Sequence, residues 1–133
     1  MHLSSSQYVR DRSTILLVED EFLLREMFGE ILTEAGHSVQ SAASAEEAAD
    51  LLGGMPMPWV LVTDINLGRA KMDGWELARL ARRRDPDRGI IYVTGDSGHR
   101  WAANGVPHSI LLPKPFVSAQ LVEAVSTLLN QPR

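Results

Sequence analysis

Short runs of apolar residues alternate along the chain with segments whose apolar residues recur every three or four positions. Continuous apolar runs are typical of strands buried on both faces, and the wider spacing is typical of helices that cover a sheet. The pattern predicts strands over residues 14–18, 37–43, 59–65, 90–94 and 109–112. Because helical segments separate these strands, we expect an α/β fold with right-handed crossovers and a five-stranded parallel sheet between two layers of helices.

The helical segments carry start and stop signals. The inward face of the first helix is expected to hold Leu24, Phe28, Ile31 and Ala35. Gly36 supplies a stop after it, and Ser44 with Glu47 resembles a capping box for the second helix. Asp73 and Ser118 are candidate N-caps of two later helices.

Composition narrows the possible functions of the chain. A length of 133 residues suits one domain, for which we expect residues 14–130, after a flexible tail over residues 1–13. The net charge of −4 argues against general binding of nucleic acid, and the absence of cysteine excludes disulfides and thiolate metal sites. No segment reads as a signal peptide or is long enough to span a bilayer, so a cytoplasmic location is expected.

Polar residues stand at or just after the carboxyl ends of four of the predicted strands. The first strand ends in Glu19 and Asp20, the third in Asp64 and the fourth in Thr94. The fifth runs into Lys114, which stands between two prolines that hold it in an extended or turn geometry. Because ligands of open parallel sheets collect beyond the carboxyl ends of the strands, we expect these side chains to meet at one edge.

Clustered carboxylates repel one another unless a pKa rises or a cation binds. With oxygen ligands only, magnesium is the expected cation, and together with Lys114 it would suit a transferring phosphoryl group. Asp64 would then be the nucleophile that forms an aspartyl phosphate, and Thr94 would donate a hydrogen bond to a phosphoryl oxygen. Taken singly, each residue also fits a helix cap or an ordinary turn, so the prediction depends on their joint occurrence.

Five motifs resemble the receiver domains of two-component response regulators, over roughly residues 14–130. They are "LLVEDE" at 16–21, "LVTDINL" at 61–67, "MDGWELA" at 72–78, "VTGD" at 93–96 and "LPKPF" at 112–116. The resemblance implies a flavodoxin-like, doubly wound sheet of strand order 2-1-3-4-5. It also implies that Asp64 is the phosphoacceptor, with Thr94 as the switch hydroxyl and Lys114 as the cation.

For the metal, the resemblance implies Mg²⁺ bound by Glu19, Asp20, Asp64 and the backbone carbonyl of Asn66. The resemblance also implies a cis peptide bond between Lys114 and Pro115, which is common in the family. Three features depart from the family pattern: a longer loop after Asp64 with Gly68 in place of a proline, Glu-Asp instead of Asp-Asp, and Leu111 where the family usually has Tyr or Phe.

The function implied is that of a single-domain response regulator rather than an enzyme. It would take its phosphoryl group from a sensor histidine kinase or phosphotransfer protein and switch a surface that contacts a downstream protein, without binding nucleic acid or a membrane. One alternative is a degenerate receiver that binds partners without phosphorylation. Another is a phosphatase of the haloacid-dehalogenase type, although that class has a second acid where this chain has Asn66.

The segment 95–106 is the weakest helix candidate, because its glycines and Asn104 lower helix propensity. Since Leu111 lacks the ring of an aromatic switch residue, this segment is where we expect phosphorylation to change the order of the chain, with Trp101 as a reporter.

Overall fold

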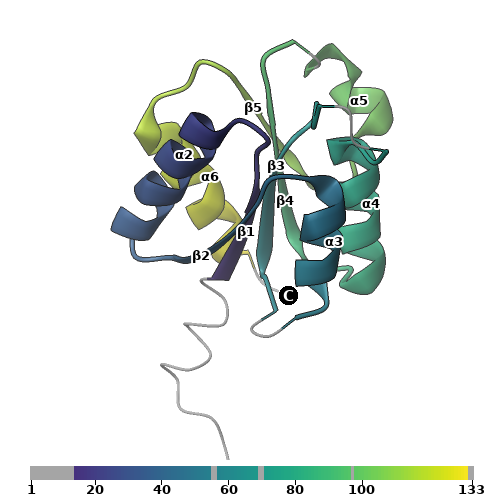
Figure 1. Ribbon diagram of the computed structural model, residues 1–133, viewed down its shortest axis with the longest axis horizontal. Coiled ribbons are helices and arrows are strands. Elements are labelled where there is room, and N and C mark those ends of the chain that lie inside the picture. The colour runs from purple at the N-terminus through teal and green to yellow at the C-terminus, as the bar shows by residue number, and fades with distance from the viewer. Residues whose placement is uncertain (1–13, 55–56, 69–70, 97, 132–133) are drawn as a thin grey trace, which may run out of the picture.

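Five parallel strands form one sheet in a computed structural model that describes residues 14–54, 57–68, 71–96 and 98–131. The strand order is β2-β1-β3-β4-β5, which confirms the predicted topology (Figure 1). The strands are β1 (Thr14–Val18), β2 (Ser38–Ala42), β3 (Val60–Asp64), β4 (Gly89–Thr94) and β5 (Ile110–Pro113). Each agrees with its predicted bounds to within one residue at either end.

Helices cover both faces of the sheet. They are α2 (Phe22–Glu34), α3 (Ala45–Leu52), α4 (Gly74–Arg84), α5 (Trp101–Asn104), preceded by the 3₁₀ turn η1 (Gly98–Arg100), and α6 (Ser118–Leu129). Figure 1 shows α2 and α6 on one face and α3, α4 and α5 on the other. In the part of the chain that the structure describes, none of these helices is long and apolar enough to cross a membrane.

Two apolar cores follow from the alternation of side chains along each strand. In β1, Ile15 and Leu17 pack into the core beneath α2 and α6, and Leu16 and Val18 pack into the core beneath α3 and α4. Burial on both sides explains why the central strands read as continuous apolar runs.

Helix ends test the capping predictions in detail. Ser44 accepts a hydrogen bond from the Glu47 amide at 3.1 Å, and Asp73 accepts one from the Glu76 amide at 2.9 Å, so both caps are confirmed. The prediction for Ser118 was wrong, because α6 already contains it and Val117 is the N-cap. Instead, the side chain of Gln120 reaches back to accept from the Val117 amide at 2.9 Å.

The inward face of α2 also differs from its prediction. Phe28 is buried as expected, but Ala35 is exposed because α2 ends at Glu34 and Ala35 is its C-cap. Leu32, which the pattern had not singled out, is fully buried in its place. In the described part of the predicted weak segment, the helical elements are the short η1 and α5.

Arg88 is a fully buried cation that the sequence pattern did not reveal. It lies in the turn between α4 and β4, where its Nε donates to the Pro58 carbonyl at 2.9 Å and its Nη1 donates to the Ala81 carbonyl at 3.0 Å. One side chain thereby joins the end of α4 to the segment that enters β3.

We expect Arg88→Ala to lower the free energy of unfolding by about 3 kcal/mol, because it leaves a cavity and removes the side-chain donor to the buried Pro58 carbonyl. Urea unfolding followed by circular dichroism measures this loss. Arg83→Ala, at an exposed position of α4, is the matched control and should change stability by less than about 0.5 kcal/mol. Equal effects of the two substitutions would contradict a structural role for Arg88.

Candidate functional site

The polar residues predicted from the strand ends lie together at one edge of the sheet. Glu19 and Asp20 directly follow β1, Asp64 ends β3, Thr94 ends β4 and Lys114 directly follows β5. Parallel pairing in register brings these ends together, since Asp64 pairs with Val93 and Thr94 pairs with Pro113.

Lys114 forms the central contact of the site. Its Nζ lies 3.0 Å from Asp64 Oδ2 and 3.2 Å from Glu19 Oε1, so one ammonium group bridges two strand ends. Its backbone amide donates to the Thr94 carbonyl at 2.7 Å, and the peptide bond to Pro115 is cis, as the motif implied. Burial opposes the charge of Lys114, but its hydrogen bonds and charge interactions with Asp64 and Glu19 raise its pKa above the ordinary value.

Three carboxylates form a compact acidic group. Glu19, Asp20 and Asp64 each offer one oxygen, and these oxygens all lie within 4.8 Å of one another. Glu19 and Asp64 are buried, whereas Asp20 is exposed and opens the group to solvent.

Burial is the main reason why the pKa of Glu19 rises to about 7. The charge of Asp64 raises this pKa further, while a hydrogen bond from the Glu21 amide and the charge of Lys114 lower it. A set of mutually repelling carboxylates, two of them buried, is the donor chemistry that Mg²⁺ accepts, and the residues therefore fit this ion.

Asn66 and Asp96 meet beside the acidic group. The Asn66 amide donates to Asp64 Oδ1 at 3.2 Å, and its side-chain Nδ2 donates to Asp96 Oδ1 at 3.0 Å. The Asp96 amide in turn donates to the Thr94 hydroxyl oxygen at 3.3 Å. The sequence singled out Asn66 and the motif "VTGD" that ends in Asp96, but it did not reveal the bond between Asn66 and Asp96, which joins the loops after β3 and β4.

Two glycines allow the chain to pass close to the site. A Cβ at Gly74 would lie 2.2 Å from the Asp64 carbonyl oxygen, so any larger residue would push α4 away from β3. Gly68 has a φ of 68°, and a Cβ there would lie 3.0 Å from Asp20 Oδ2. Glycine at position 68 thus brings the longer loop over the acidic group.

Comparison with known proteins identifies the same family that the sequence motifs resemble. Residues 15–126 match the family of the response regulator receiver domain. The crystal structure of a response regulator receiver protein from Sinorhizobium medicae superposes with a TM-score of 0.84 and 46% sequence identity, covering 88% of this chain and 94% of that one.

Longer relatives contain a similar segment. The response regulator MprA of Mycolicibacterium vanbaalenii is 33% identical over 119 residues, which make up 88% of this chain and 50% of that protein. The sensor kinase CckA of Brucella abortus is 35% identical over 125 residues, covering 90% of this chain and 13% of that protein. The chain therefore spans half or less of the length of these relatives, and its match along residues 15–126 shows that it belongs to the response regulator receiver domain family.

Proposed function

We propose that this receiver domain accepts a phosphoryl group on Asp64 from a sensor histidine kinase or a phosphotransfer protein. The observation that carries the proposal is the position of the Lys114 ammonium, in contact with both Asp64 and Glu19 at the mouth of the acidic group. The phosphorylated domain would then contact a downstream protein or pass the phosphoryl group on.

In the proposed step, an oxygen of the Asp64 carboxylate attacks the phosphorus atom of a phosphohistidine. The bond between phosphorus and the donor nitrogen breaks, and its electron pair stays on the imidazole. Lys114 provides positive charge beside the phosphoryl oxygens, and the Thr94 hydroxyl at the end of the neighbouring strand donates a hydrogen bond to one of them.

The proposed metal ligands are Glu19, Asp20, Asp64 and the carbonyl of Asn66. Magnesium bound there would neutralise charge between the carboxylates and an arriving phosphoryl group. The compact oxygen cluster supports this assignment, and the exposed position of Asp20 leaves a side from which an anionic donor can approach.

An apolar surface beside the site suits a protein donor. Phe22, Leu23 and Met27 of α2 are 61%, 72% and 48% exposed, and Val117 before α6 is 65% exposed. α2 begins three residues after Glu19 and contacts α6, so the apolar side chains near the starts of these two helices belong to the face of the sheet that α2 and α6 cover, close in sequence to the acidic group. We propose that the helices that carry the donor histidine dock on this surface.

The proposed switch acts through the segment after Thr94 rather than through an aromatic ring at position 111. Leu111 is half-buried and packs beneath Gly98, where a Cβ would lie 3.3 Å from the leucine side chain. The next element contains Trp101, whose Nε1 donates to Ser109 Oγ at 2.9 Å. A contact between Thr94 and a phosphoryl group would pull on this short segment, which has little helical structure to resist it.

Incubation with acetyl phosphate and magnesium should add the mass of one phosphoryl group to the intact protein, and Asp64→Asn should abolish the addition. Asp50→Asn is the matched control, because this exposed carboxylate of α3 is not part of the acidic group. Excess chelator should slow the labelling at least about tenfold. Unchanged labelling of Asp64→Asn would refute the role of Asp64 as phosphoacceptor. Absence of any labelling of the unsubstituted protein would favour a module that binds partners without phosphorylation. Turnover of a simple phosphomonoester would favour a phosphatase.

The phosphorylated form should be short-lived, because Asn66 and Asp96 hold polar groups at the mouth of the site where they can orient an attacking water. Asn66→Met removes this bond and should lengthen the phosphoprotein lifetime by about tenfold, as measured by intact mass over time after removal of the donor. A lifetime of many hours that Asn66→Met leaves unaltered would count against this role.

Phosphorylation or a phosphoryl mimic should change amide hydrogen exchange across residues 95–106, together with the fluorescence of Trp101. Leu111→Ala should leave that response largely intact, because the proposed path runs through Thr94 and the chain that follows it. Constant protection of the segment, with loss of signalling in Leu111→Ala, would show that position 111 governs the switch.

A further inference from the structure

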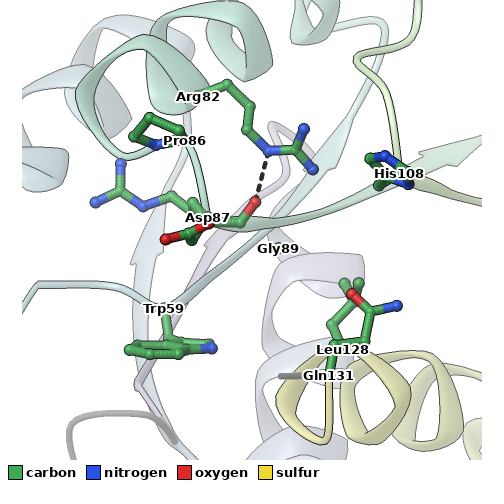
Figure 2. Close-up of a pocket in the computed structure, with 9 residues that line it drawn as sticks. Trp59, Arg82, Pro86, Asp87, Gly89, His108, Leu128 and Gln131 are labelled. Carbon is green, nitrogen blue, oxygen red and sulfur yellow. Dashed lines mark hydrogen bonds between the residues drawn. The ribbon is translucent and has the colours of Figure 1, made fainter. Parts of the chain in front are cut away.

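A cavity lies at the end of the sheet opposite to the end that carries Asp64. Its volume is about 230 Å³, and it forms where three strands begin rather than where they end. Trp59 directly precedes β3, Gly89 is the first residue of β4, and His108 stands two residues before β5. Figure 2 shows these residues around the cavity, with α4 contributing Arg82 and α6 contributing Leu128.

Arg82 is a half-buried cation on the wall of this cavity. Its Nε donates to the Arg88 carbonyl at 2.7 Å and its Nη1 donates to the Pro107 carbonyl at 2.5 Å, so backbone oxygens hold the guanidinium in place. The charges of Asp87 and Asp85 act on Arg82 from nearby, but in the part of the chain that the structure describes neither carboxylate is within ion-pair distance of it, and its second terminal nitrogen takes no part in the two backbone bonds. Burial lowers the pKa of Arg82, and the charges of Asp87 and Asp85 oppose this shift.

The other walls of the cavity are partly apolar and partly charged. Trp59 and Leu128 lie across the cavity from Arg82 in Figure 2 and offer an indole ring and an aliphatic side chain. Asp87 and Arg88 also line the cavity, so its charged lining is two guanidinium groups and one carboxylate, an excess of one positive charge that a ligand with one negative charge balances. A guanidinium opposite an apolar wall matches a carboxylate attached to a flat apolar body.

We propose that this cavity is a second binding site, which takes a small monocarboxylate with a single ring. The carboxylate would lie against Arg82 and the ring against Trp59 and Leu128. The volume is below the range of about 300 to 1,000 Å³ that is typical of sites for larger ligands, and this limits the ligand to roughly one ring. The site is separate from the acidic group, so its occupancy does not depend on Asp64.

Titration with sodium benzoate, followed by ¹H–¹⁵N NMR, tests the proposal. Saturable shifts are expected at the Trp59 indole N–H and the Gly89 amide, with a Kd on the order of 1 mM for so small a ligand. Benzamide, which has the same shape without the charge, should bind at least about tenfold more weakly. Asp64→Asn should bind benzoate as the unsubstituted protein does, which separates this test from that of phosphorylation.

Substitutions locate the site. Arg82→Gln should abolish the saturable shifts, while Arg83→Gln makes the same change of charge at an exposed neighbouring position and should leave the Kd unchanged. Because Arg82→Gln also loses two backbone contacts, Asp87→Asn is the second arm and should tighten benzoate binding by about threefold. Equal binding of benzamide, a Kd unchanged in Asp87→Asn, or an equal loss in Arg82→Gln and Arg83→Gln would overturn the proposal.

Discussion

The bridge from Lys114 to Asp64 and Glu19 is the interaction on which the rest of the site depends. Without the ammonium group, two buried carboxylates would face each other across adjacent strands in a region of low dielectric. Burial, and after it the charge of Asp64, raises the pKa of Glu19 to about 7, and the charge of Lys114 lowers this pKa without cancelling the shift. The acidic edge therefore keeps an excess of carboxylates over cations, which supports the proposed binding of Mg²⁺ and of a phosphoryl group there.

Much of this site could be predicted from the sequence because parallel topology does most of the positioning. Lys114 and Glu19 are 95 positions apart, yet each directly follows a strand, and strand ends of a parallel sheet share one edge. The apolar runs located β1, β3 and β4 to within one residue, since burial on both faces of these strands leaves little freedom in the pattern.

Features that depend on individual side-chain conformations could not be predicted in this way. Arg88 lies in a stretch that reads as an ordinary polar turn, and only the packed structure reveals that its guanidinium joins two segments from within. The bond between Asn66 and Asp96 likewise requires two loops to face each other at hydrogen-bonding distance. Ser118 resembled an N-cap because serine is favoured at that position. In the structure, the Gln120 side chain within α6 instead accepts a hydrogen bond from the backbone amide of Val117, the N-cap.

The close approach of Gly74 to the end of β3 has a mechanical consequence. The Gly74 amide donates to the Ile65 carbonyl at 2.9 Å, and the lack of a side chain lets α4 lie directly against the strand that carries Asp64. A displacement of α4 toward β3 would force backbone atoms into contact. On the other side of β4, α5 has only four residues. We therefore expect the deformation proposed to begin at Asp64 to be taken up by the short α5 rather than by α4.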